Sequence, residues 1–450
     1  MTLPGGGRLD DASYRSARAM EAKSPISSAS TPQRSSLTAR HPNSRSLAGL
    51  DWFAFFMADI QTGWGPFVAA YLTSVGWTQL DIGLILTIGT LTALALQIPI
   101  GGLVDRVPNK LFLASLAIAL VSGSALLLAL WPVFSVVVAA KVLHAFASCL
   151  LGPALAAISL GLVGHELLSV RLGRNARYLS LGNAIAAGAM GAVAYYFSNQ
   201  TIFFFTAALA IPTFLALAQI RSRDIDRNVA RGGVIAGEPL DWRSALRSVA
   251  RNPAFLIFAG AVLLFQCANA ATMPIMAGLL TIHEPQTAPL VLSICIFGPQ
   301  FVVTAIAPWV GGKTQDWGRR PLLALCFIAL SIRCAAFAIT SEPYAVVAVQ
   351  LFDGISAATL GILVPLIIAD VMRGTGHFNF AQGVIGAAVG IGASLSTALA
   401  GYIADGFGAS AAFLFLTGAA VTGLVFVVGL MPETRPAAQR PDVGLRLREH

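Results

Sequence analysis

Charged residues are scarce in this chain. Only 11% of its 450 residues are Asp, Glu, Lys or Arg, whereas 56% are hydrophobic, and soluble proteins carry about 25% charged residues. A water-soluble core of this size could not bury so much apolar surface, which excludes a soluble globular protein. The apolar runs continue for about 20 residues without alternation, so they predict membrane-spanning helices rather than the strands of a membrane barrel.

Signatures of catalysis and of metal binding are also missing. The five cysteines all fall inside apolar runs, and their spacing fits neither a disulfide framework nor a metal site. The chain has no Walker-type phosphate-binding loop and no polar segment long enough to fold as an enzyme domain. We therefore expect a protein that is not an enzyme, is not driven by ATP through this chain, and uses no cofactor or metal.

The apolar runs predict an all-α membrane protein with twelve transmembrane helices. These spans lie at approximately 50–72, 80–104, 111–130, 133–160, 178–197, 201–220, 253–280, 288–310, 321–340, 344–370, 379–402 and 408–431. A polar central loop, 222–252, separates an N-terminal six-helix half, 47–221, from a C-terminal half, 253–432. Residues 1–46, rich in Ser, Arg and Pro, predict a disordered cytoplasmic tail, and 433–450 form a second cytoplasmic tail.

Basic residues are distributed on one side of these spans. Of the 29 Lys and Arg residues, 27 lie in the tails, the central loop or the loops after even-numbered spans, and only Lys141 and Arg333 lie inside spans. By the positive-inside rule both termini are cytoplasmic, in the inner (plasma) membrane of a bacterium. The net charge of +8 is then a topology signal with a lipid-headgroup contribution, and it does not indicate a nucleic-acid partner. Within the central loop, Asp241–Arg251 could form an amphipathic helix on the membrane surface.

The two halves share three landmarks in the same order. "KVLHAFASCLLG" (141–152) aligns with "QLFDGISAATLG" (350–361) at an offset of 209 residues, and the segments that follow are also alike. Two charged knots, "GGLVDRVPNK" (101–110) and "GGKTQDWGRR" (311–320), follow spans 2 and 8. The landmarks predict a duplicated six-span unit, which is the usual build of secondary transporters with a substrate site between the halves.

The knots contain the parts of a latch. Glycine lets two helices approach closely, and an Asp at a helix end can face the positive N-terminus of a neighbouring helix. Arg and Lys could then bridge to that Asp across the cytoplasmic mouth. The knots therefore predict a cytoplasmic gate, with a plain orientation-setting loop as the alternative.

With these features, residues 48–432 resemble the major facilitator superfamily. The first copy of its loop signature matches at Gly101, Asp105, Arg106 and Lys110, and the second at Gly312, Asp316, Gly318, Arg319 and Arg320. Pro108 and Asn109 stand where Gly and Arg are usual, and span 5 lacks the Gly-Pro pair of the antiporter signature. The resemblance implies two pseudo-symmetric six-helix halves that rock around a midplane cavity, in a monomer.

Ionisable residues inside spans cost about 2.5–3.5 kcal/mol each, so they mark functional candidates. The candidates for proton coupling and substrate binding are Asp59, Lys141, His144, Arg333 and Asp353. The neutral polar residues that could line the cavity, or form hydrogen bonds between helices, are Gln61, Asn183, Gln266, Asn269, Gln350 and Gln382. Structural alternatives stay open: Asp59 paired to a neighbouring helix, Lys141 reaching for the membrane surface, and an Arg333–Asp353 pair between adjacent spans.

The prediction is a secondary active transporter of a small organic solute that works by alternating access. Its partners are the solute, protons as the coupling ion, and the lipid bilayer. Proton-driven efflux is the first expectation, with proton-linked uptake and an uncoupled facilitator as alternatives. A membrane sensor or assembly protein without transport is the alternative from another class. The candidate residues include both signs of charge, so cationic, anionic and zwitterionic solutes all stay open.

Overall fold

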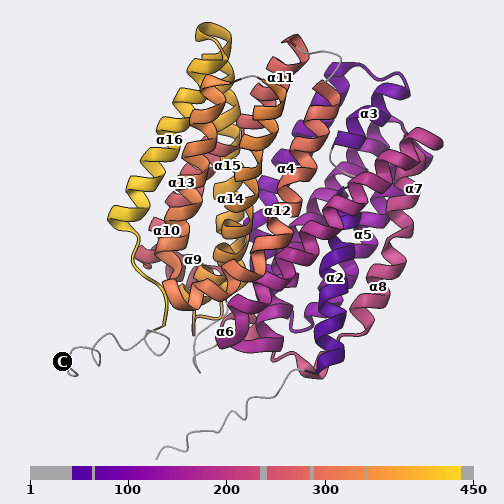
Figure 1. Ribbon diagram of the computed structural model, residues 1–450. Helices are drawn as coiled ribbons and strands as arrows, with labels where there is room; N and C mark the ends of the chain where they lie inside the picture. The colour runs from indigo at the N-terminus through magenta and orange to yellow at the C-terminus, as the bar shows by residue number, and fades with distance from the viewer. Residues whose placement is uncertain (1–42, 63–65, 234–240, 284–287, 341, 437–450) are drawn as a thin grey trace, which may run out of the picture. The chain divides into compact units, whose positions relative to one another are not determined.

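The computed structural model describes residues 43–62, 66–233, 241–283, 288–340 and 342–436, and these residues are almost entirely helical (Figure 1). The predicted tails lie outside this part, apart from residues 43–46 and 433–436. The helices of the first half are α2 (Ser44–Thr62), α3 (Pro66–Ser74), α4 (Gln79–Arg106), α5 (Lys110–Leu130), α6 (Phe134–Tyr196), α7 (Thr201–Ala208) and α8 (Ala210–Ala218). Those of the second half are α10 (Pro253–Asn269), α11 (Thr272–His283), α12 (Ala288–Trp317), α13 (Arg319–Ile339), α14 (Pro343–Val371), α15 (Phe378–Phe407) and α16 (Ala409–Leu430).

Helices fill every predicted span, and ten helical stretches in the described residues are long and apolar enough to cross a membrane. The 63-residue α6 occupies spans 4 and 5 together, and its only non-helical residue is Gly164, with φ of 71°. Asn175 Nδ2 donates to Ser159 Oγ at 2.7 Å, although sixteen residues of straight helix would place them about 24 Å apart. The chain therefore reverses at Gly164, and the predicted loop between these spans is wrong because those residues are helical.

One span of the second half is interrupted within the described residues. Span 7 is divided between α10 and α11, and Pro274 near the start of α11 cannot donate to the carbonyl of Ala270. Interrupted helices of this kind are common beside transporter binding sites.

The central loop contains the helix that its sequence predicted. After two short 3-10 helices, η1 (Ser222–Asp224) and η2 (Val229–Arg231), the chain forms α9 (Trp242–Ala250). The Asp241 side chain caps α9 by accepting the backbone N–H of Ser244 at 2.8 Å. The predicted amphipathic helix is thus present at the predicted residues.

The halves contact each other through α4 with α15 and through α6 with α12 and α14. Glycines bring these helices together: a Cβ at Gly101 would lie 2.3 Å from the carbonyl oxygen of Asn379, and one at Gly311 would lie 2.7 Å from that of Ser169. Neither position has room for a larger residue without separating the helices. Small residues at these crossings therefore allow the backbones to touch.

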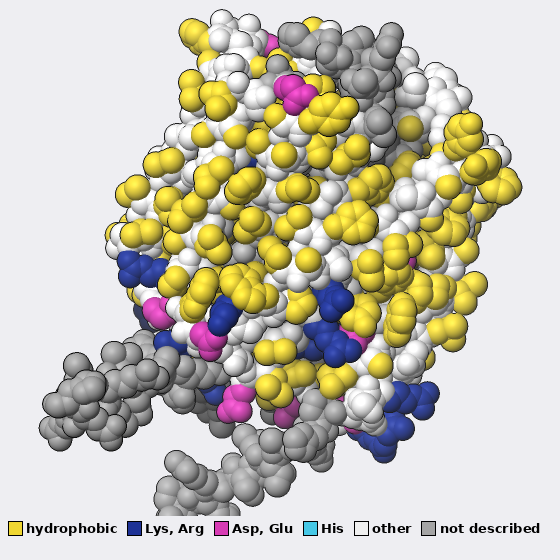
Figure 2. Space-filling model, viewed as in Figure 1, with side chains coloured by type: hydrophobic (Ala, Val, Ile, Leu, Met, Phe, Trp, Pro, Cys, Tyr) yellow, Lys and Arg dark blue, Asp and Glu magenta, His cyan; other side chains and the backbone are white. Residues whose placement is uncertain are grey.

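The described Lys and Arg residues gather at one end of the helices, apart from Lys141 and Arg333 inside them. Figure 2 shows this in one view, with basic side chains in the lower part and hydrophobic side chains over the band above. We call this the basic end; it holds the last turns of α4 and α12 and the helix α9. The apolar band is the surface that a bilayer would cover.

Candidate functional site

The first knot joins the two halves. Asp105, in the last turn of α4, accepts hydrogen bonds from the backbone N–H of Asn379 (3.0 Å), from the Asn379 amide Nδ2 (2.8 Å) and from the backbone N–H of Phe380 (2.7 Å). Both residues lie in the first turn of α15, whose N–H groups have no partner within the helix. A carboxylate at this position also faces the positive end of the helix dipole. Asp105 thus forms a latch between the halves at the basic end.

The basic residues of this knot do not bridge to Asp105. Lys110 donates from Nζ to the backbone carbonyls of Val104 and Val107. Arg106 points outward, and no ion pair joins it to another described residue. Asn109 explains the geometry, because its side chain caps α5 by accepting the N–H of Phe112 at 3.1 Å. That cap places Lys110 beneath the carboxyl-terminal end of α4, so the predicted charge bridge is wrong for both residues.

The second knot is built differently from the first. Asp316 is exposed and pairs with Lys313 at 3.0 Å, rather than facing a helix of the other half. The contact to the first half comes from Gln315, whose amide donates to the carbonyl of Glu166 and to Ser169 Oγ, both at 3.1 Å. The glycine that packs against α6 is Gly311, whereas the predicted Gly312 has open space around it. The two copies of the motif therefore join the halves differently, the first through the carboxylate of Asp105 and the second through the amide of Gln315.

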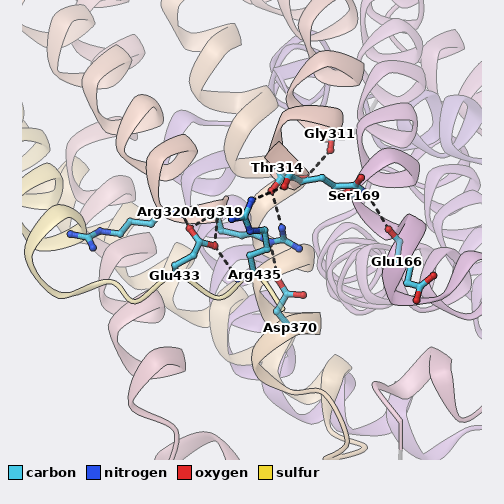
Figure 3. Close-up of polar contacts among 10 residues, drawn as sticks. Glu166, Ser169, Gly311, Thr314, Arg319, Arg320, Asp370, Glu433 and Arg435 are labelled. Atoms are coloured by element: carbon cyan, nitrogen blue, oxygen red, sulfur yellow. Dashed lines mark hydrogen bonds and ion pairs between the residues drawn. The ribbon is translucent and has the colours of Figure 1, made fainter. Parts of the chain in front are cut away.

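Arg319 and Arg320 hold the turn between α12 and α13 (Figure 3). The backbone N–H groups of both donate to Glu433, at 2.9 and 3.1 Å. The buried Arg319 guanidinium donates to Asp370 (2.9 Å) and to the carbonyl of Thr314 (2.8 Å). All of these contacts stay inside the second half, so the two arginines support the knot rather than cross to the first half. Glu433, which the sequence placed in a tail, is part of this support.

A cavity of about 530 Å³ lies between the halves. Helices α2, α4 and α6 of the first half and α12, α14 and α15 of the second contribute to its wall. Its polar lining is uncharged and consists of Gln97, Asn175, Ser180, Asn183, Gln300 and Gln382. The remaining lining is apolar or glycine, and none of the predicted ionisable residues is among it. The midplane cavity is therefore lined by neutral polar and apolar residues. Asn183 and Gln382 line it as the sequence predicted, whereas the predicted ionisable residues do not.

A smaller cavity of about 360 Å³ adjoins the first, because both use Ala357, Gly361, Val364 and Pro365 of α14. Gln266, Asn269 and Asp353 line it, as the sequence predicted for a cavity. Arg333 is buried beside it, where the guanidinium pairs with Asp353 and donates to Asn269 Oδ1. The structural alternative of an Arg333–Asp353 pair is thus what the structure contains.

None of the ionisable candidates of the first half lines the main cavity. Asp59 is only 4% exposed, lies against Gly182, and its Oδ1 accepts no hydrogen bond from the described residues. Its neighbours Met57 on α2 and Asn183 on α6 do line the cavity. Asp59 is therefore close to the cavity without facing a counter-charge.

Lys141 and His144 lie three residues apart on α6, about one helical turn. The methylene stem of Lys141 is buried against Gly89 of α4, where a Cβ would lie 3.1 Å from Cγ of the lysine. His144 Nε2 contacts Ser148 Oγ at 3.2 Å. The two remaining candidates, Gln61 and Gln350, line neither cavity, and Gln350 is buried.

The sequence analysis did not predict a cluster of charged residues at the basic end. Asp51, 2% exposed near the start of α2, pairs with Arg171 and Arg174 of α6, each at 2.5 Å. Arg171 also donates to Asn175 Oδ1 at 2.8 Å. The sequence assigned the two arginines to a loop, and a helical spacing of three residues between them was the available signal. The cluster fixes α2 against α6 beside the cavity.

Comparisons with known proteins agree on one family. The model of the Major Facilitator Superfamily matches residues 52–316 and 264–446. An "uncharacterized MFS-type transporter" of Mycobacterium tuberculosis, found in two strains, is 38% identical over 409 residues, which are 89% of this chain and 97% of the relative.

Two solved structures share the fold at low sequence identity. The human organic anion transporter TETRAN aligns with a TM-score of 0.61 and 13% identity over 85% of this chain and 99% of that one. The transporter FucP, in its outward conformation, aligns with a TM-score of 0.62 and 14% identity over 85% of this chain and 97% of that one. With its duplicated helical halves, its interhelical latch and its central cavity, this multi-pass membrane transporter belongs to the Major Facilitator Superfamily.

Proposed function

We propose that this transporter exports a small organic solute in exchange for protons, by alternating access of the cavity between its halves. The observation that supports this proposal is the buried Asp59 carboxyl group, which has an oxygen without a hydrogen-bond partner among the described residues and lies against Gly182, next in the chain to the cavity-lining Asn183. An isolated charge at such a depth is costly, so a proton that arrives at Asp59 or leaves it changes the local energy strongly. That energy is available to shift the balance between two conformations.

The cavity lining also favours one class of solute. It combines amide groups with apolar side chains such as Leu155, Val303 and Ile385 and has no charged side chain. Binding sites of this composition take molecules with an apolar body and a few hydrogen-bonding groups. The proposed substrate is therefore a neutral or weakly charged organic molecule that fits about 530 Å³.

The latch gives the transport cycle its two states. In the latched state Asp105 holds α15 against α4 at the basic end, which in this proposal faces the cytoplasm, and the cavity exchanges with the opposite side. Rocking of the halves would separate Asp105 from α15 and open the cavity to the cytoplasm. A proton that binds Asp59 from the outer side would accompany the return of the empty cavity to the cytoplasmic side. Its release there, as the solute binds, would let the loaded cavity turn outward.

The test is solute-driven proton flux in liposomes that contain the purified chain, an imposed pH gradient and a pH-sensitive dye. A panel of neutral, cationic and anionic solutes is added one at a time. We expect a neutral or weakly charged solute to collapse the gradient with the wild type, and Asp59→Asn to abolish this flux while labelled solute still exchanges for unlabelled solute. Asp316→Asn, which removes an exposed carboxylate far from the cavity, is the matched control and should transport normally.

Other outcomes identify the alternatives. Solute movement without proton movement in the wild type would replace coupling with facilitated diffusion. A proton flux in the same direction as the solute would indicate uptake. Full proton coupling in Asp59→Asn would show that Asp59 has no part in the mechanism. If no solute of the panel moved protons or was itself transported, the alternative of a membrane sensor without transport would be favoured.

A further inference from the structure

A second large hollow lies away from the central cavity, at the basic end. Its volume is about 660 Å³, and its wall is formed by α4, by α9, by the start of α15 and by Phe146 of α6. The apolar lining consists of Leu96, Ile98, Pro99, Ile100, Leu103, Phe146, Trp242, Ala245, Leu246 and Phe380. The polar lining consists of Asp105, Arg106, Asp241 and His377. We call this hollow the α4–α9 groove.

The groove has the depth of one membrane leaflet. It follows α4 from Leu96 to Arg106, ten residues of helix, which span about 15 Å. The hydrocarbon core of a bilayer is about 30 Å thick, so one leaflet contributes about half of it. The groove is apolar along this path and has its polar residues at the basic end, as a single lipid molecule does.

Helix α9 lies on the groove as an interfacial helix would. Ala245 and Val249 are buried against the protein, whereas Trp242 and Leu246, four residues apart, are about half exposed and line the groove. Arg243 follows Trp242 and contacts its ring at 5.5 Å, with Arg247 one turn further along. An apolar face with arginines beside it is the pattern of a helix that rests on an anionic membrane surface.

Arg106 is the basic side chain of the groove lining, and the two carboxylates of the lining, Asp105 and Asp241, are hydrogen-bonded within the protein. Both oxygens of Asp105 are occupied by α15. Asp241 accepts the N–H of Ser244, and the hydrogen bonds from Ser244 lower the pKa of this carboxyl group. Arg106 is exposed at the mouth and forms no ion pair with any residue that the structure describes. A guanidinium in this position is suited to a phosphate, which it can hold with two hydrogen bonds.

We propose that the α4–α9 groove binds one anionic phospholipid, with an acyl chain against α4 and α9 and the phosphate at Arg106. The bound lipid touches α4 of the first half, α9 of the central loop and α15 of the second half. A ligand that contacts both sides of a closed junction binds the closed state better and so increases its population. The lipid therefore stabilises the latched state, and this regulatory consequence rests on the proposed transport cycle.

The groove and the latch share residues, which is the physical basis of this coupling. Phe380 lines the groove with its side chain while its backbone N–H donates to Asp105. His377, just before α15, contacts Ser244 of α9 through Nε2 at 3.1 Å. Separation of α15 from α4 would therefore open one wall of the groove and release the lipid.

Tryptophan quenching by brominated lipids tests the binding step without any transported solute. The signal of Trp242 is the difference between the wild type and Trp242→Phe, measured in phosphatidylcholine vesicles that contain a small fraction of brominated phosphatidylglycerol or brominated phosphatidylcholine. We expect stronger quenching by the anionic lipid, and Arg106→Gln should lower this preference by about fivefold, the usual effect of one basic residue near an anionic surface. Arg227→Gln, an exposed arginine outside the groove, is the matched control and should keep the preference.

Equal quenching by the two brominated lipids in the wild type, or an equal loss in Arg106→Gln and Arg227→Gln, would overturn the proposed site. Leu246→Ser provides a second variant that removes an exposed side chain of the groove wall, and it should weaken quenching by both lipids. The coupling step is measured as the distance between spin labels at Pro108→Cys and Arg373→Cys. Phosphatidylglycerol should increase the short-distance population, and an unchanged distribution despite preferential binding would overturn the stabilisation of the latch.

Discussion

The carboxylate of Asp105 on α4 accepts the backbone N–H of Phe380 on α15 at 2.7 Å, and this bond joins the two halves of the transporter. Asp316, at the equivalent place of the second knot, is exposed and pairs with its neighbour Lys313. The same residue type at the same motif position therefore stands in two different environments. The difference makes the two residues a matched pair for testing the latch.

Replacing Asp105 should release the latch, whereas replacing Asp316 should not. Asp105→Asn keeps the size of the side chain but removes the charge that faces the N-terminus of α15, an interaction of about 1–2 kcal/mol in buried geometry. The population of the latched state should fall by about five- to thirtyfold. Spin labels at Pro108→Cys and Arg373→Cys would report the separation. A similar shift in Asp316→Asn, or no shift in Asp105→Asn, would show that the latch is not the contact that closes this end.

A methyl group at Gly101 should prevent closure at the same interface. The added Cβ would lie 2.3 Å from the carbonyl oxygen of Asn379, and backbone atoms cannot give way easily. Alanine favours helices over glycine by about 1 kcal/mol, so an effect of local propensity alone would be stabilising. We expect Gly101→Ala to shift the spin-label distances to longer values. Gly188→Ala is the control, because Gly188 is also helical but has no atom within 4 Å of the added Cβ.

The membrane spans could be predicted because each requires a long apolar run that few other structures produce. The sequence could predict that Asp105 lies at a helix end where it can meet another helix, but not that the residue it meets there, Asn379, lies 274 residues further along the chain. Asp316 shows the limit of this reasoning. Whether a carboxylate meets a helix end depends on the position of the other half, and in the second knot Gln315 reaches it instead.

The lining of the cavity could be predicted only in part, at Asn183 and Gln382. A charged residue in an apolar span is selected as a functional candidate because its burial is costly. Arg333, however, offsets that cost within its own half by pairing with Asp353. Neutral amides such as Gln97 and Gln300 carry no such signal, since an isolated Gln in a helix is common and its face depends on packing. The turn at Gly164 was hidden in the same way, because one residue with positive φ replaces a whole loop.

Removing Arg333 should destabilise the second half. Its guanidinium is buried, pairs with Asp353 and also donates to Asn269 and Thr272. Arg333→Met leaves the Asp353 charge without its partner, which costs about 3–5 kcal/mol for a buried pair. The midpoint of thermal unfolding in detergent should fall markedly. The double variant Arg333→Met with Asp353→Asn should recover part of the loss, and a purely additive decrease would contradict the role of the pair.

The amides of the cavity should determine affinity for the solute, and Gln300 tests this against Gln61. Gln300 lines the cavity, whereas Gln61, which the sequence placed there, does not, and its amide donates to the carbonyl of Met57 at 3.5 Å. Loss of one hydrogen bond to a solute costs about 0.5–1.5 kcal/mol, so Gln300→Ala should raise KM for a transported solute by about two- to twelvefold. The maximal rate should change little, because the bond is present both before and after the halves move. Gln61→Ala should leave both constants unchanged, and a larger effect there than at Gln300 would mean that the solute binds on the Asp59 side of α2 rather than in the amide-lined cavity.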